Sequence, residues 1–368
     1  MRDTSRIDTE LTDIAYLANA GARVAVLSHQ GRHKDGSALH LDGIADYLGR
    51  KLGRTVLYIP ENTTDAAISA SLGLEPGVIA VFGNTRHHSG EEAGDLGLAA
   101  RFARLGDAVA IGGFSKAHRG HASNVGLLSY LPGWAAQSLT EEIQRLAPWS
   151  GTQSDLPSLA VLGGVKPEKT LIGLRSFSQA YDVVVPGGAV LNHVLHQSGF
   201  EIGDSELGDD PARCAAVTDE VLTQARARIH IPSRVIVAQT VHGFYQESYE
   251  IDISDGVPRG FGIVDFRLEP WLLGHMGKMG EQGGRAVIAG TPCVHRKGFR
   301  KASGALLHWA SQPSIDAILM GGDTTSELPF AGPTSTGGGS ALCYLGEADL
   351  PVLKALRENA TQTWQAIR

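Results

Sequence analysis

Basic side chains and glycine-rich segments lie in different halves of this 368-residue sequence. Five basic residues of the first half follow or flank apolar runs that are typical of strands: His29, Arg32, Arg86, His118 and Arg119. In an open α/β sheet the carboxyl ends of the strands face the ligand crevice, so we expect these residues to lie close together. A guanidinium group can bind phosphate through two parallel hydrogen bonds. The pattern therefore predicts a site for an anionic, phosphorylated small molecule.

Glycine pairs and one carboxylate mark the second half. Gly163-Gly164 and Gly187-Gly188 follow apolar runs, and Gly337-Gly338-Gly339 offers consecutive backbone amides. Backbone without side chains can approach a nucleotide closely, and its amides can bind phosphate. Asp323, with Thr324 beside it, is suited to Mg²⁺, which prefers oxygen ligands and takes few of them from protein. Taken singly, each of these segments also fits an ordinary turn.

Strand-like and helix-like segments alternate along the chain. Short runs rich in Val, Ile and Ala are typical of strands buried on both faces of a parallel sheet, and they occur at residues 23–28, 55–59, 78–82, 108–112, 158–162, 182–185, 234–238, 285–289 and 317–320. Amphipathic segments at 9–19, 41–51, 91–105, 211–226 and 301–311 predict helices. The alternation predicts an α/β fold with parallel, doubly wound sheets.

The length favours two domains rather than one core. A helical pattern at residues 135–146, with Ser138 as its expected amino-terminal cap, precedes a turn-rich segment at 148–157. We expect this helix to connect two α/β lobes.

Composition excludes some functions. The net charge of −7 and the isoelectric point near 6.0 argue against nucleic acid or an anionic membrane as the main partner. Cys214, Cys293 and Cys343 are widely spaced and form no zinc or disulfide pattern. With no apolar signal segment and no run long enough to span a membrane, we expect a cytoplasmic protein.

The sequence resembles the phosphoglycerate kinase family, through motifs that occur in the family's order. The matching segments are Asp3–Ile7, Ser28–Arg32, Asn84–His88 with Glu91-Glu92, Phe114–Ser123, Leu162–Lys166, Gly321–Thr324 and Ser335–Gly339. The resemblance implies two Rossmann-like lobes joined by an interdomain helix. Residues 1–149 would form the acid-substrate lobe, to which residues 346–368 return, and residues 150–345 would form the nucleotide lobe.

The resemblance also implies the chemistry. ATP and Mg²⁺ would phosphorylate the carboxylate of a small phosphorylated acid, 3-phosphoglycerate or an analogue, with ADP and an acyl phosphate as products. Arg6, Lys166 and Lys169 match catalytic positions, and the five basic residues above match the site for the substrate's phosphate. The nucleotide would contact Thr324 and the glycine segments at 163–164, 187–188 and 337–339, with Asp323 on the magnesium ion. Members of the family are usually monomers, so we expect a monomer.

The chain departs from the family at ligand positions. The family's opening strand, with its substrate-binding Asp and Asn, has no counterpart, because the resemblance begins just after it. Lys169 follows Lys166 by three residues, where the family spacing is four. The family carboxylate that holds the ribose hydroxyls is replaced by His295 or Arg296. Gly112-Gly113 replaces Asn-Asp, and the hinge segment is altered at 262–267.

These departures leave two alternatives open. A changed acid site could admit an amine, so that the acyl phosphate serves an amide- or ester-forming ligase of specialised metabolism. The altered ribose and hinge segments also fit a non-catalytic protein that binds ligands without turnover.

Overall fold

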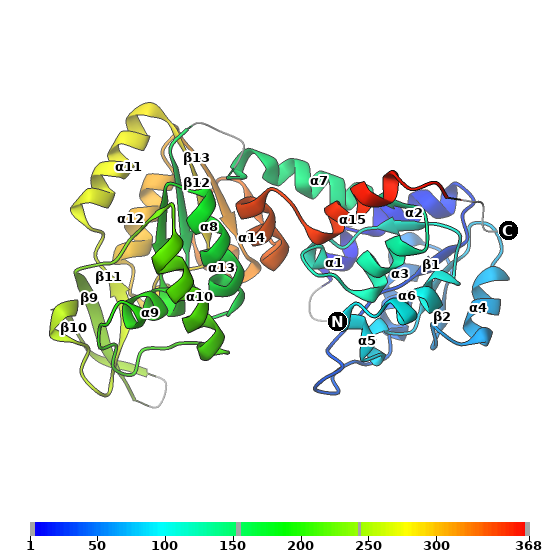
Figure 1. Cartoon of the computed structure of the whole chain (residues 1–368), viewed down its shortest axis with the longest axis horizontal. Helices are drawn as coiled ribbons and strands as arrows, with labels where there is room; N and C mark the ends of the chain where they lie inside the picture. The colour runs from blue at the N-terminus through cyan, green and yellow to red at the C-terminus, as the bar shows by residue number, and fades with distance from the viewer. Residues whose placement is uncertain (1–3, 152–155, 242–243, 365–368) are drawn as a thin grey trace. The chain divides into compact units, whose positions relative to one another are not determined.

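The computed structural model describes residues 4–151, 156–241 and 244–364 (Figure 1). Asp3, residues 152–155 of the turn-rich segment and residues 365–368 of the expected returning segment lie outside these ranges. The backbone divides into two compact units, residues 1–145 with 349–368, and residues 146–348. Within the described ranges, no helix is both long and apolar enough to cross a bilayer.

The first unit is built on short parallel strands. β1 (Val24–Val26), β3 (Ile79–Phe82) and β2 (Val56–Ile59) form a parallel sheet in that order, and β4 (Val109–Ile111) pairs with β5 (Gly133–Ala135). The central strand β3 is buried along its whole length, as its apolar sequence predicts. The helices of this unit are α1 (Ser5–Asp8), α2 (Leu11–Asn19), α3 (Asp42–Leu52), α4 (Asp65–Leu72), α5 (Gly90–Ala93), α6 (Leu96–Ala103), most of α7 (Gln137–Leu146) and α15 (Pro351–Ala360).

Two helix boundaries differ from the expected ones for local reasons. The helix expected at 91–105 is divided into α5 and α6, because Gly94 adopts a left-handed φ of 67° and Asp95 then caps Leu98 N at 2.6 Å. Ser138 is not the cap of α7. The carboxylate of Asp13 accepts hydrogen bonds from the first amides of α7, Gln137 N and Ser138 N, both at 2.9 Å.

The carboxyl-terminal helix α15 is bonded to the first unit. Asn359, buried on this helix, donates to the carbonyls of Leu128 and Leu131 at 2.7 and 2.8 Å and accepts from Gly133 N at 2.9 Å. Val352 N donates to Ala117 O at 3.2 Å. A buried amide with three satisfied hydrogen bonds fixes the position of the helix on this unit.

The second unit contains a six-stranded parallel sheet in the order β14-β13-β12-β6-β7-β8. Its strands are β6 (Ser158–Leu162), β7 (Val183–Pro186), β8 (Arg228–Ile229), β12 (Gly284–Ala289), β13 (Ile315–Met320) and β14 (Thr334–Ser335). The surrounding helices are α8 (Arg175–Ala180), α9 (Gly188–Gln197), α10 (Pro211–Gln224), α11 (Pro270–Gln282), α12 (Lys301–Ala310), α13 (Gly322–Glu327) and α14 (Gly338–Glu347). Figure 1 shows α11 and α12 on one side of β12 and β13 and α8 on the other. The fold is therefore mixed α/β with mostly parallel sheets, as predicted.

One strand lies in a different sheet from the expected one. The run at 234–238 was predicted for the parallel sheet, but it is part of β9 (Arg234–Val241), the centre of an antiparallel sheet with β10 (Phe244–Asp252) and β11 (Phe261–Phe266). Val235 and Val237 of β9 are buried in the core of this unit, whereas most residues of β10 are exposed. A strand beside a half-exposed partner is typical of an antiparallel sheet.

Candidate active site

The loops after β1, β3 and β4 bring the basic residues of the first unit together. Thr85 N donates to Ser28 O at 3.1 Å, which ties the loop after β3 to the loop after β1. Arg86, buried in this loop, donates to Gly31 O and pairs with Glu92 at 3.3 Å. Arg119 Nε lies 3.1 Å from His118 Nε2 in the loop after β4. Arg86, His118 and Arg119 thus lie in loops at the carboxyl ends of β3 and β4, and the charges of Arg86 and Arg119 act on His29 in the loop after β1.

His29 is neutral in this environment. Burial, followed by the charges of Lys116 and Arg86, lowers the pKa of His29 to about 2. Its imidazole therefore offers hydrogen bonds rather than a positive charge, which differs from the expectation of a cationic residue. The positive charge of the cluster comes from its arginines and from Lys116.

Lys116 and Glu91 lie inside the cluster and were not among the predicted site residues. Lys116 Nζ contacts Ser123 Oγ at 3.3 Å, and burial lowers the pKa of this amine. The fully buried Glu91 carboxylate accepts from Ser123 N and Oγ at 3.0 and 2.5 Å. Glu91 thereby holds Ser123, which is also the hydrogen-bond partner of Lys116.

Two buried nitrogen atoms of the cluster lack a hydrogen bond among the described residues, Arg86 Nε and His121 Nδ1. His121 Nδ1 lies 3.7 Å from Glu91 Oε1, which is too long for a hydrogen bond. Buried polar groups are normally paired, so the unsatisfied Arg86 Nε donor beside several positive charges favours a site that an anion completes. Arg6 and Arg32 are exposed in the same unit, on α1 and in the loop after β1.

In the second unit the glycine loops pack directly against one another. A Cβ atom at Gly163 would lie 2.2 Å from Thr291 O, and one at Gly187 would lie 2.4 Å from Pro292 Cα. Gly188 has a positive φ of 54° and donates to Pro292 O at 2.9 Å. Glycine is therefore required at these positions because two backbone segments of the protein approach each other closely.

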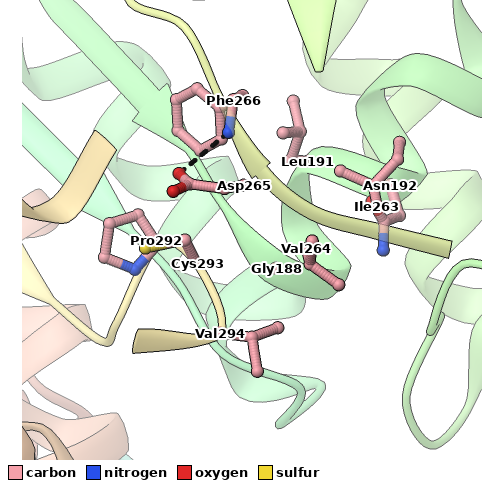
Figure 2. Close-up of a pocket in the computed structure, with 10 residues that line it drawn as sticks. All are labelled: Gly188, Leu191, Asn192, Ile263, Val264, Asp265, Phe266, Pro292, Cys293 and Val294. Carbon is pink, nitrogen blue, oxygen red and sulfur yellow. Dashed lines mark hydrogen bonds between the residues drawn. The ribbon is translucent and has the colours of Figure 1, made fainter. Parts of the chain in front are cut away.

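A small cavity lies beside this junction (Figure 2). Its volume is about 20 Å³, room for roughly one water molecule. Figure 2 shows Leu191 and Asn192 of α9 on one side and Pro292 to Val294 on the other. The cavity is apolar apart from Asn192 and the Asp265 carboxylate, which accepts hydrogen bonds from Lys301 N and Ala302 N.

Lys166 and Asp323 form an ion pair at the carboxyl ends of β6 and β13. Lys166 Nζ lies 2.7 Å from Asp323 Oδ2, and this hydrogen bond lowers the pKa of the carboxyl group. Both side chains are mostly exposed, 68% and 82%. Burial and then the Lys166 charge lower the pKa of Lys169 to about 8, while the Asp323 charge opposes that shift. Lys169 therefore lies close enough to both residues for their charges to act on it. The spacing of three residues therefore keeps both lysines near Asp323.

Two further predicted nucleotide segments lie at the amino ends of α13 and α14. Thr324 is buried at the first turn of α13, and the glycines at 337–339 begin α14, where Gly337 N donates to Ser335 Oγ at 3.1 Å. Gly321 N donates to Ser335 O at 2.8 Å, so the amino ends of α13 and α14 lie together. Helix amino ends favour anions, and here they adjoin a lysine pair.

Comparison with known proteins identifies the fold and its family. The phosphoglycerate kinase family model matches residues 1–347. The chain belongs to the phosphoglycerate kinase family. It is 29% identical to the phosphoglycerate kinase of Moorella thermoacetica, over 97% of this chain and 92% of that protein, and 32% identical to that of Zymomonas mobilis, over 96% and 91%. The solved phosphoglycerate kinase of Coxiella burnetii has a TM-score of 0.71 at 26% identity, covering 98% of this chain and 92% of that one.

Membership of the phosphoglycerate kinase family makes the chain a phosphotransferase. A second solved structure, the phosphoglycerate kinase of Pyrococcus horikoshii, supports the fold alone, with a TM-score of 0.69 at 23% identity. The basic residues of the first unit and the Lys166–Asp323 pair lie within the matched range. Their roles stay predictions.

Of the two residues expected where the family has a ribose-binding carboxylate, His295 is buried and Arg296 has a side chain that is 63% exposed. Arg296 donates to Ser326 Oγ at 3.0 Å, and its backbone N donates to Glu327 Oε1 at 3.2 Å. The sequence reasoning missed Glu327. Its only sequence signal is that it follows Asp323 by four residues, the spacing that places two side chains on one face of a helix.

Proposed function

We propose that this protein transfers the γ-phosphoryl group of ATP to the carboxylate of 3-phosphoglycerate or a close analogue, forming an acyl phosphate. One observation carries the proposal: the Lys166–Asp323 pair, at 2.7 Å, adjoins the glycine loops of a chain that matches the phosphoglycerate kinase family over residues 1–347. ATP, ADP and the acid would be the chain's small-molecule partners.

The first unit would hold the acid by its phosphate group. Arg86, Arg119 and Lys116 supply positive charge, and the unsatisfied Arg86 Nε offers a donor that phosphate oxygens can satisfy. His118 and the neutral His29 would add hydrogen bonds, and Arg32 would reach the phosphate from the rim of the cluster. Arg6 would lie near the reacting carboxylate and reduce its repulsion with the phosphoryl group.

The second unit would hold the nucleotide. Amides at the amino ends of α13 and α14, with Lys166 and Lys169, would bind the phosphates. The base would lie beside Gly188 and Pro292, where the present cavity of about 20 Å³ is too small for a purine. Base binding therefore requires the walls of this cavity to separate.

In the transfer step a carboxylate oxygen of the acid forms a bond to the γ-phosphorus while the bond from that phosphorus to the bridging oxygen breaks. ADP leaves with the electron pair of the broken bond. Lys166 would offset the charge of the phosphoryl group as it moves, so the protein supplies positioning and charge neutralisation. No covalent enzyme intermediate is needed.

The donor set fits Mg²⁺ bound mainly through the nucleotide. Asp323 is an exposed carboxylate, and Mg²⁺ is usually held by one or two carboxylates together with substrate phosphates. Across the described ranges, no group of three His, Cys, Asp or Glu side chains is arranged to hold a metal ion alone. When bound, the ion would neutralise phosphate charge, and Lys166 would have to release Asp323.

The proposal is tested by measuring ADP formation from ATP and Mg²⁺ with and without 3-phosphoglycerate. We expect release that depends on the acid, a loss of about 100-fold or more in Lys166→Met, and a similar loss in Asp323→Asn. Lys278→Met removes an exposed lysine of α11 and should retain wild-type rates. ADP release that is independent of every added phospho-acid would contradict the proposal.

A further inference from the structure

Glu327 connects the two regions that a nucleotide would occupy. It ends α13, whose first turn carries Asp323, and residues four apart lie on one face of a helix, one turn away from each other. Its Oε2 accepts a hydrogen bond from Thr291 Oγ1 at 2.9 Å. Thr291 precedes Pro292, which lines the cavity of Figure 2. The carboxylate thus lies between the phosphate end and the base end of the site.

The Glu327 carboxylate can accept further hydrogen bonds between the two regions that the nucleotide would occupy. Two hydrogen bonds are assigned to it, from Thr291 Oγ1 and from Arg296 N at 3.2 Å. A carboxylate has about four acceptor positions, so about two are left. The side chain is 16% exposed, which leaves it accessible while its two partners fix its orientation.

The Arg296 side chain does not occupy the free acceptor positions of Glu327. Its Nε lies 4.0 Å from Glu327 Oε2, beyond hydrogen-bond distance, and its guanidinium is directed to Ser326 Oγ at 3.0 Å. The guanidinium therefore makes no hydrogen bond to the carboxylate, and among the described residues the donors to Glu327 are Thr291 Oγ1 and Arg296 N.

We propose that Glu327 binds the ribose 2′- and 3′-hydroxyl groups of the nucleotide, so that α13 supplies the carboxylate that the segment at 295–296 lacks. A vicinal diol presents two donors at the spacing that one carboxylate can accept, and acidic side chains bind ribose hydroxyls in other nucleotide folds. The inference rests on the proposed function, because it requires a nucleotide at this site. It makes Glu327 a determinant of ribonucleotide preference.

The test compares the dissociation constants of Mg-ATP and Mg-2′,3′-dideoxy-ATP by titration calorimetry. We expect the wild-type protein to bind ATP more tightly by roughly 10- to 100-fold, the usual effect of hydrogen bonds to a charged group. Glu327→Gln should reduce this preference to a few-fold by weakening ATP binding, with dideoxy-ATP affinity nearly unchanged. Glu281→Gln, an exposed change on α11, is the matched control and should keep the preference.

Thr291→Val separates ribose binding from a structural connection. It removes the hydrogen bond that ties the 290–296 loop to α13 but retains the carboxylate. If Glu327 serves only as that connection, both variants will weaken ATP and dideoxy-ATP equally, and the inference is wrong. Equal wild-type affinity for the two nucleotides also overturns it and leaves the proposed function intact. Absence of binding by either nucleotide overturns both.

Discussion

Replacing Gly163 by alanine tests the backbone packing that builds the nucleotide face. The added Cβ would lie 2.2 Å from Thr291 O, 2.4 Å from Thr291 C and 2.7 Å from Pro292 N. These are backbone atoms, so the loop at 290–292 must move by about 1 Å or more to restore an ordinary contact. Forced overpacking of this kind costs about 1–3 kcal/mol.

The expected loss of folding free energy corresponds to a decrease in the melting temperature. In a folding unit of roughly 200 residues, 1 kcal/mol corresponds to about 2–4 °C, so Gly163→Ala should lower the transition of the second unit by about 2–12 °C. That transition is identified in scanning calorimetry as the one that Mg-ADP raises. Because the same loop carries Pro292, nucleotide affinity should fall as well.

Gly304→Ala is the matched control. Gly304 is exposed within α12, and among the described residues its added Cβ would meet no atom within 4 Å beyond its chain neighbours and the backbone of its own helix. Alanine in a helix interior is favoured over glycine by about 0.5–1 kcal/mol, so this variant should melt about 1–4 °C higher than wild type. A Gly163→Ala protein that melts within about 1 °C of wild type and binds nucleotide normally would refute the packing argument.

Three further predictions concern charge. Arg119→Ala should weaken 3-phosphoglycerate binding by about 10- to 100-fold in calorimetry while Mg-ADP binding stays within about twofold; equal loss of both ligands would point to misfolding instead. The pKa of Lys169 is lowered to about 8, so its positive charge is present below that pH and absent above it. The rate of phosphoryl transfer should therefore decline above pH 8, and Lys169→Arg should remove this decline. If the dependence of the rate on pH is the same in the variant and the wild type, Lys169 does not take part in the transfer step. The pKa of His29 is lowered to about 2 in the folded protein, against about 6.5 in the unfolded chain, so the contribution of this residue to the free energy of unfolding is present above pH 6.5 and is lost as the pH falls, by about 2 kcal/mol between pH 6.5 and 4.5. When the free energy of unfolding is measured by urea denaturation at each pH, His29→Gln should show a smaller decrease over this range. The same decrease in the variant and the wild type would show that His29 ionises normally.

The strands of the six-stranded sheet could be predicted because burial on both faces leaves a continuous apolar run. β6, β12 and β13 are buried along almost their whole length, and their bounds lie within one or two residues of the predicted ones. β10 could not be found in this way, because most of its residues are exposed and it carries charged side chains such as Glu250. Without β10, the sequence offered no reason to place β9 in an antiparallel sheet.

Sequence motifs can indicate which residues belong to one candidate site, but they cannot indicate what the packing around those residues does. Lys166 and Asp323 are separated by 157 residues, and the family motifs predicted that both belong to one site, which the 2.7 Å contact between them supports. The motifs did not reveal that burial makes His29 neutral, because desolvation depends on the surrounding fold. They also missed Glu327, whose position depends on Thr291 in a distant loop.

Trapping the product with hydroxylamine tests the central claim most directly. Hydroxylamine converts an acyl phosphate into a hydroxamate, which is detected by its ferric complex or by mass spectrometry. We predict hydroxamate formation that requires protein, ATP, Mg²⁺ and 3-phosphoglycerate or an analogous phospho-acid, and that is lost in Lys166→Met. ADP release without any hydroxamate, or no reaction with any phospho-acid despite nucleotide binding, would contradict phosphoryl transfer to a carboxylate.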